Sequence, residues 1–441
     1  MSIPVITVGS TEEDLVGGLE RLHGPVTVVR RCTELAELIA ACQSGLARAA
    51  VVAGGSEELT ASLIDRLHAV GVAVVALSDV PEERARLSSI GVGVAPLAVE
   101  PGVLAERLSE AVRQLSGNSR SRPESGLGGF NSAYADPSDA AVSALDIDQP
   151  TPLAEGTGQV IAVWGPAGAP GRTTIAVNMA AELSAEGKSV ILIDADSYGA
   201  SIATMLGLLD ESAALAHACR LADQGVLDDA ALLRIAMPVV TKGGIMRVLT
   251  GITRADRWTE LRAAALERVI ERCKANAEYV VIDAGFCLEA DEELSFDTLA
   301  PRRNAATLRS LELADKVFAV GLASPIGVPR LVRALAELEQ SVPSAAPLVL
   351  MNNVRSALLG RSPETQLRDA WDRFAPASSI TAFLPADQAA TDAALLSGSV
   401  LLEVAPDSDL RRGIAALVCA PVQRKRKSSV FSTTAQRRAK R

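Results

Sequence analysis

Residues 160–196 constrain the fold more than any other part of this chain, because they read as strand, glycine-rich turn, helix and strand. Their sequence is VIAVWGPAGAPGRTTIAVNMAAELSAEGKSVILIDAD. Val160–Trp164 and Ser189–Ile193 are short, mainly apolar runs, typical of strands that are buried on both faces. Thr173–Ala185 carries its apolar residues at helical spacing. Because two strands joined by a helix run parallel, this stretch predicts an α/β fold with a mainly parallel, doubly wound sheet.

The turn in this unit has the composition of a phosphate-binding loop. Glycines at 165, 168 and 171 let the backbone bend so that successive N–H groups point into one concavity. The helix expected from Thr173 adds partial positive charge at its N-terminus. The loop is therefore predicted to hold a phosphate group.

Two acidic residues, Asp194 and Asp196, follow the second strand. Ligands of open α/β sheets bind at the carboxyl ends of the strands, where these side chains are expected. Ordinary solvent-facing positions at a strand end are the alternative. Their place after a buried run and a phosphate loop favours a functional role.

These residues resemble the ParA/MinD superfamily of P-loop ATPases, whose loop reads KGG-x-GKTT and whose next strand ends in D-x-D. The resemblance covers most of residues 158–420. Four loop positions match the pattern: Gly168, Gly171, Thr173 and Thr174. Three depart from it: Ala167 replaces the signature Lys, Ala169 replaces a Gly, and Arg172 replaces the phosphate-binding Lys.

Three later segments resemble further motifs of that superfamily. Tyr279–Asp283 is similar to the strand whose terminal Asp holds Mg²⁺ through water. Leu348–Asn353 is similar to the strand whose terminal Asn reads the adenine base, which indicates Asn352, with the adjacent Asn353 as an alternative. Phe383–Asp387 resembles the late strand and loop.

The resemblance implies ATP and Mg²⁺ as ligands and assigns a role to each matching position. Thr173 and Asp283 would hold Mg²⁺, Asp196 would orient the attacking water, and Asp194 would support the metal shell. Nucleotide contacts would come from Gly168, Gly171, Arg172, Thr173, Thr174 and Asn352. Because Arg172 presents a planar fork, Pro170 lacks an N–H and Ala167 offers no cation, we expect weak or absent hydrolysis.

Residues 1–115 alternate apolar strands with helical segments and resemble the receiver domain of response regulators. That resemblance implies a five-stranded parallel sheet of the flavodoxin type. A working receiver has an acidic pair, a phosphate-accepting Asp and a Lys after its first, third and fifth strands. This chain has Gly9 and Ser10, then Ala53 and Gly54, then Leu97, so we expect a pseudo-receiver.

A receiver-like domain before a ParA/MinD-type ATPase is the arrangement of the CpaE/TadZ proteins, including actinobacterial members described as septum site-determining proteins. This resemblance implies a homodimer that spatially positions a cell-envelope machine, through partners in a septal or a tad-type pilus or secretion apparatus. A pseudo-ATPase scaffold is the alternative. A DNA-partitioning ParA is a further, less favoured alternative.

The two resemblances imply a receiver-like domain 1–115 and an ATPase domain 159–422, and composition predicts a flexible linker 116–158 and a basic disordered tail 423–441. The linker is rich in Ser, Gly, Pro and Asp. Residues 424–441 carry eight Lys and Arg and no acidic residue, in a chain of formal net charge −10. Such a tail attracts anionic lipid or nucleic acid, or is merely solvated.

The remaining features of the sequence point to the cytoplasm. The six cysteines form no C-x-x-C pair, so neither a zinc site nor a disulfide framework is indicated. No signal sequence and no apolar run of membrane-spanning length is evident. We expect a cytoplasmic protein, or one that is peripheral at the inner face of the membrane, the pole or the septum.

Overall fold

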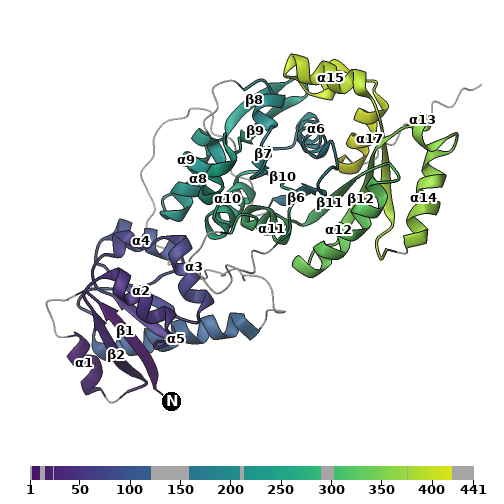
Figure 1. The fold of residues 1–441 in the computed structure, drawn as a ribbon. Helices are drawn as coiled ribbons and strands as arrows, with labels where there is room; N and C mark the ends of the chain where they lie inside the picture. The colour runs from purple at the N-terminus through teal and green to yellow at the C-terminus, as the bar shows by residue number, and fades with distance from the viewer. Residues whose placement is uncertain are drawn as a thin grey trace, which may run out of the picture.

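The structure, a computed structural model, contains two α/β units that are separate along the chain (Figure 1). It describes residues 2–9, 15–22, 24–120, 158–208, 213–289, 302–374 and 376–419. The expected basic tail and most of the expected linker lie outside these residues. Within the described part of the chain, none of the helices has the length and apolar character that crossing a membrane requires.

The N-terminal unit is a five-stranded sheet, all parallel, in the order β2-β1-β3-β4-β5. This is the strand order of flavodoxin-type folds, as expected. Its strands are β1 Ile3–Val8, β2 Val26–Cys32, β3 Ala49–Val52, β4 Ala73–Leu77 and β5 Gly93–Ala95. Its helices are α1 Leu15–Arg21, α2 Leu35–Gln43, α3 Ala61–Ala69, α4 Pro81–Ser89 and α5 Pro101–Arg120, with a 3₁₀ turn at Ser56–Glu58.

Helix α5 extends five residues beyond position 115, where the receiver-like segment was expected to end. At that point the Ser116 hydroxyl donates to the carbonyl of Val112 at 2.8 Å and lies 3.1 Å from a guanidinium nitrogen of Arg48. Ser116 therefore belongs to the helix, where composition alone indicated the start of a linker.

The C-terminal unit is an eight-stranded sheet in the order β13-β12-β11-β6-β10-β7-β9-β8, parallel except for the edge strand β8. Its strands are β6 Gln159–Trp164, β7 Val190–Ala195, β8 Met237–Thr241, β9 Gly244–Leu249, β10 Tyr279–Ala284, β11 Lys316–Leu322, β12 Pro347–Val354 and β13 Ile380–Pro385. Its first helices are α6 Arg172–Ala185, α7 Ile202–Met205, α8 Ala214–Asp223, α9 Asp229–Ile235, α10 Ala263–Asn276 and α11 Ala305–Glu312, with a 3₁₀ segment at Ala255–Glu260. The later ones are α12 Gly327–Ser341, α13 Ser356–Leu359, α14 Pro363–Phe374, α15 Gln388–Ser397, α16 Leu401–Val404 and α17 Asp409–Val418.

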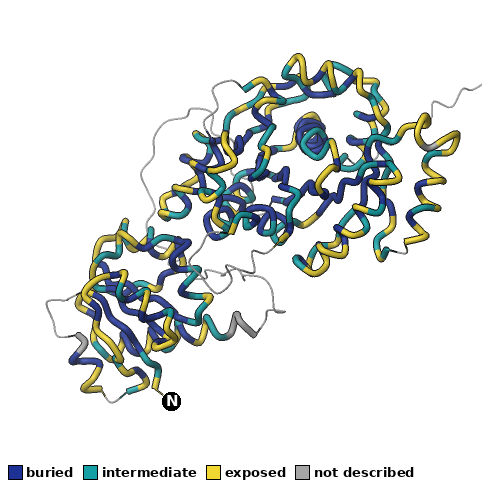
Figure 2. The backbone as a smooth tube through the Cα atoms, viewed as in Figure 1, coloured by how far each residue is buried: buried dark blue, intermediate teal, exposed yellow. Residues whose placement is uncertain are grey.

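Helices cover both faces of this larger sheet, with α6, α15 and α17 on one side and α10, α11 and α12 on the other (Figure 1). Alternate residues of β6 pack in opposite directions: Ile161 and Val163 contact the core around α6, whereas Val160 lies in the core around α8 and α10. The central strands are buried while the outer helices present exposed residues (Figure 2). Trp164, the last residue of β6, is fully buried.

The two units contact each other through α3 and α4 of the first and the C-terminal end of α8 in the second. The backbone N–H of Ser62 donates to Asp223 at 2.8 Å, and a guanidinium nitrogen of Arg86 lies 3.1 Å from the carbonyl of Gln224. The Ser89 hydroxyl donates to the carbonyl of Gly225 at 3.1 Å. The N-terminal unit thus packs against the helical face of the larger sheet.

Candidate functional site

The predicted acidic residues meet at the carboxyl ends of three neighbouring strands. Strand β10 lies between β6 and β7, and its register places Asp283 opposite Asp194 on one side and Val163 on the other. The glycine-rich loop follows β6 at the same edge and leads into α6. The crevice expected at this edge of an open sheet therefore contains the loop and the carboxylates together.

The backbone of the loop bends at its glycines, as the sequence predicted. Gly168 and Gly171 have φ angles of +74° and +94°, in the left-handed region where a side chain is strained. Gly171 is the N-cap residue of α6, and Thr173 and Thr174 lie in the first turn of that helix. The N–H groups at the start of α6 thus point toward the loop, as in a phosphate-binding helix N-terminus.

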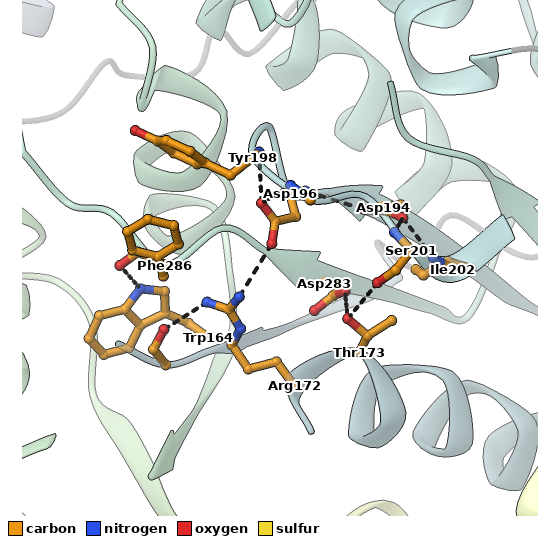
Figure 3. A network of polar contacts seen from close by, with 12 residues as sticks. Trp164, Arg172, Thr173, Asp194, Asp196, Tyr198, Ser201, Ile202, Asp283 and Phe286 are labelled. Atoms are coloured by element: carbon orange, nitrogen blue, oxygen red, sulfur yellow. Dashed lines mark hydrogen bonds and ion pairs between the residues drawn. The ribbon is translucent and has the colours of Figure 1, made fainter. Parts of the chain in front are cut away.

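Thr173 and Asp283 form the closest polar contact of the site, with the threonine hydroxyl donating to Oδ2 of the aspartate at 2.6 Å (Figure 3). The hydroxyl of Ser201 lies 3.3 Å from that of Thr173. The other oxygen of Asp283, Oδ1, is buried and has no hydrogen-bond partner in the part of the chain that the structure describes. A buried carboxylate oxygen without a donor is costly, and a cation bound at this atom would remove that cost.

Asp194 is held by backbone donors beside this pair. Its Oδ2 accepts from the N–H groups of Ser201 and Ile202, each at 2.9 Å, and its Oδ1 accepts from the N–H of Asp196 at 3.3 Å. Burial raises the pKa of Asp194 to about 6. Burial, followed by the charge of Asp194, raises the pKa of Asp283 well above its ordinary value. A cation between these carboxyls would relieve both effects.

The residues present fit a magnesium ion. Mg²⁺ prefers carboxylate and hydroxyl oxygens and usually keeps several of its waters. Thr173 would offer its hydroxyl and Asp283 its unpartnered oxygen, while Asp194 would add negative charge nearby. A bound Mg²⁺ would supply positive charge for phosphate oxygens at the loop.

The guanidinium of Arg172, the basic residue of the loop, points toward Asp196 (Figure 3). One guanidinium nitrogen donates to the carbonyl of Gly165 at 2.9 Å, and another lies 3.3 Å from Oδ2 of Asp196. The guanidinium carbon is 6.0 Å from the centre of the Phe286 ring. Arg172 therefore neutralises the carboxylate for which the resemblance implied a water-orienting role.

Asn352, expected to read the adenine base, lies at the end of β12 with its side-chain amide on the loop. Its Nδ2 donates to the carbonyl of Pro170 at 2.8 Å, and a Cβ at Gly171 would lie 2.3 Å from the same nitrogen. In this arrangement the side chain of Asn352 binds the backbone of the loop. Its contact with adenine stays a prediction.

Comparisons with known proteins find similarity around the glycine-rich loop. Residues 156–260 match the family model described as "ParA: NUBPL iron-transfer P-loop NTPase". The matched residues include β6, the glycine-rich loop, α6 and β7. A curated septum site-determining protein, MinD of Synechocystis sp., is 26% identical over 194 residues, which are 42% of this chain and 69% of that protein.

Other relatives match shorter segments or match at lower identity. The iron-sulfur cluster carrier protein of Salmonella typhimurium is 47% identical over 60 residues, 14% of this chain, and the match spans only 16% of that protein's length. A ParA family ATPase from Chlorobium tepidum TLS is 19% identical, with a TM-score of 0.48 over 59% of this chain and 98% of that one. MinD from Pyrococcus horikoshii OT3, solved with Mg-ADP, is 20% identical with a TM-score of 0.45 over 59% of this chain and 94% of that one.

Sequence reasoning missed several residues of this site. Ser201 contacts both Thr173 and Asp194, and Phe286 packs beside Arg172. Tyr198 donates its backbone N–H to Asp196 at 2.9 Å. Serine and aromatic residues in loops carry no motif of their own, so only their nearness to the D-x-D strand and to Asp283 could have drawn attention to them.

The raised pKa values predict that stabilisation by Mg²⁺ depends on pH. An unfolded Asp titrates near 3.9, so between about pH 4 and pH 6 the metal-free folded state binds more protons at Asp194 than the unfolded state. The free energy of unfolding contributed by this group therefore falls as pH rises, while Mg²⁺ needs the ionised carboxylates. The rise in Tm that excess MgCl₂ causes, relative to EDTA, should be larger at about pH 7.5 than at about pH 5. An equal rise at both values would contradict this reading of the acidic pair.

Proposed function

We propose that this chain is a nucleotide-dependent switch that binds Mg-ATP at the loop between β6 and α6 and hydrolyses it weakly or not at all. One observation carries the proposal: Oδ1 of Asp283 is buried without a hydrogen-bond partner among the described residues, next to the hydroxyl of Thr173. This oxygen and the hydroxyl of Thr173 would help to hold an Mg²⁺ ion, which would bring positive charge to the phosphates of a nucleotide in the loop.

The weak hydrolysis in this proposal follows from the basic residues rather than the acidic ones. Arg172 is engaged by Asp196 and by the carbonyl of Gly165. Ala167 adds no charge to the loop, and Pro170 has no backbone N–H to donate. Phosphoryl transfer depends on positioned cations that neutralise developing charge. The site therefore favours binding over turnover.

In the cell, the proposed switch positions a machine of the cell envelope as a CpaE/TadZ-like protein. The curated MinD relative supports a septal role, and the flavodoxin-order unit before the ParA/MinD-type unit supports the CpaE-like arrangement, which includes tad-type pili. The proposal includes a homodimer, domains at 1–115 and 159–422, and a cytoplasmic or peripheral membrane location. Residues 424–441 would add contact with an anionic membrane or nucleic acid.

A pseudo-ATPase scaffold is the second candidate, and the ion pair between Arg172 and Asp196 favours it. A cation that is already neutralised contributes less to phosphate binding, and the fold would then serve as a platform for partner proteins. The two candidates differ in one measurable property, the affinity for nucleotide.

The decisive experiment is calorimetric titration of the full-length protein with ATP and ADP, each in excess MgCl₂ and in EDTA. A switch is expected to bind Mg-ATP with a micromolar Kd and to lose most of that affinity in EDTA. Absence of binding at millimolar Mg-ATP would overturn the proposal and support the scaffold. A turnover assay on the same sample measures how slowly bound ATP is hydrolysed.

A further inference from the structure

A second arginine, far from the loop in sequence, lies against the phosphate loop. Arg330 is the fourth residue of α12, and its Nη1 donates to the carbonyl of Ala167 at 3.0 Å. The start of α12 is fixed, because the N–H of Gly327 donates to the hydroxyl of Ser324 at 3.0 Å and a Cβ at Gly327 would lie 2.1 Å from the carbonyl of Leu322. The base of the Arg330 side chain is thus rigidly placed beside the loop.

The guanidinium of Arg330 also packs on the backbone of Gly168. A Cβ at this position would lie 2.2 Å from Nη1 of Arg330. Gly168 has a φ of +74°, so the turn and the nearby guanidinium both require a residue without a side chain. Gly168 is therefore needed for two reasons: its backbone has a positive φ, and the guanidinium of Arg330 occupies the space of a side chain.

The charge of Arg330 is not neutralised in the part of the chain that the structure describes. Its side chain is exposed and its hydrogen bond is to a neutral carbonyl, with no carboxylate within ion-pair distance among the described residues. Arg172, by contrast, pairs with Asp196, and both side chains are largely buried, at 17% and 8% exposed. Of these two arginines at the loop, Arg330 is the one available to an anion.

We propose that Arg330 binds phosphate at this loop. When a nucleoside triphosphate binds, the guanidinium of Arg330 leaves the carbonyl of Ala167 and contacts the terminal phosphate. This inference rests on the nucleotide binding proposed above. A guanidinium binds phosphate oxygens through two charge-assisted hydrogen bonds, which are stronger than one bond to a neutral carbonyl. When Arg330 exchanges the Ala167 carbonyl for phosphate, it brings a positive charge to a part of the loop where the sequence has the neutral Ala167.

The test compares Arg330→Gln with Arg333→Gln, a matched control on the same helix. Arg333 is also exposed, and its Nε lies 3.3 Å from the carbonyl of Pro329 within α12. Calorimetry should show that Arg330→Gln weakens Mg-ATP binding by about 10- to 100-fold, the effect of losing a charge-assisted contact. Mg-ADP binding should change little, and Arg333→Gln should leave both affinities unchanged.

The possible outcomes separate this inference from the proposed function. If the unaltered protein binds no nucleotide, both fail. If it binds Mg-ATP and Arg330→Gln binds equally well, only the role of Arg330 is overturned. Tighter binding by Arg330→Gln would also overturn it, because the arginine would then block the loop. Since Arg330 is exposed, Tm should be unchanged in both variants, and Arg330→Lys should recover part of the lost affinity.

Discussion

Asp283→Asn is expected to remove the magnesium dependence of nucleotide binding and to stabilise the metal-free protein at the same time. The carboxyl of Asp283 is 1% exposed, lies opposite Asp194 in the sheet and has a raised pKa because of burial and that neighbouring charge. Asparagine keeps an acceptor for the hydroxyl of Thr173 but cannot supply the negative charge that Mg²⁺ requires. Loss of a residue that holds a metal or its bound water costs about 10- to 100-fold in affinity.

The rise in stability has a separate physical cause. Two buried carboxyls on neighbouring strands repel each other when both ionise, so removing one charge favours the folded state without metal. Each kcal/mol gained would raise Tm by about 2–4 °C in a unit of this size. Thermal melts in EDTA measure this effect, and titrations with Mg-ATP measure the loss of affinity.

Asp315→Asn is the matched control for this experiment. Asp315 accepts the backbone N–H of Val160 at 2.7 Å, at the opposite end of β6 from the loop. This variant should keep the magnesium dependence of the unaltered protein. If Asp283→Asn bound Mg-ATP normally, or melted at a lower temperature in EDTA, the assignment of Asp283 as a metal-holding residue would be wrong.

The parts of the site that local patterns encode were predictable from the sequence. The glycines of the loop, the helix that begins at its end, and the position of Asp194 after a buried run all depend on residues close together in the chain. Parallel strands joined by helices bring their carboxyl ends to one edge, so Asp283 could be expected near the loop. The structure adds the register between β10 and β7, which places Asp283 directly opposite Asp194.

The directions of the long side chains were not predictable. The sequence places Arg172 at the start of α6. Its guanidinium contacts the Gly165 carbonyl after β6 and Asp196 after β7, and these partners come together only in the folded sheet. The position of Arg330 on the loop depends on β11 lying next to β6, which brings α12 to Ala167. No motif links residues 163 positions apart, because the contact exists only through the strand order.

Arg172→Lys is expected to increase ATP turnover by releasing Asp196. The guanidinium of Arg172 bridges the carbonyl of Gly165 and Asp196 with two different nitrogens. A lysine ammonium is a single compact charge and cannot make both contacts with the same geometry, so it is free to contact phosphate oxygens inside the loop. In P-loop NTPases a lysine at this position cradles the β- and γ-phosphates.

The expected gain is about tenfold in kcat, on the order of what one positioned acid–base or charged group contributes to catalysis. Turnover would still be limited, because Ala167 and Pro170 are unchanged. Steady-state phosphate release measures kcat, and calorimetry on the same sample gives the affinity for Mg-ATP.

Arg172→Gln separates the two roles of the arginine, since it frees Asp196 but provides no cation for the phosphates. We expect this variant to bind Mg-ATP more weakly than the unaltered protein, because the carboxylate of Asp196 loses its cation and repels the phosphates. It should show no gain in turnover. If lysine and glutamine behaved alike, the charge at position 172 would contribute nothing to phosphate binding. If neither changed turnover or affinity, the contact of Arg172 with Asp196 would be only structural.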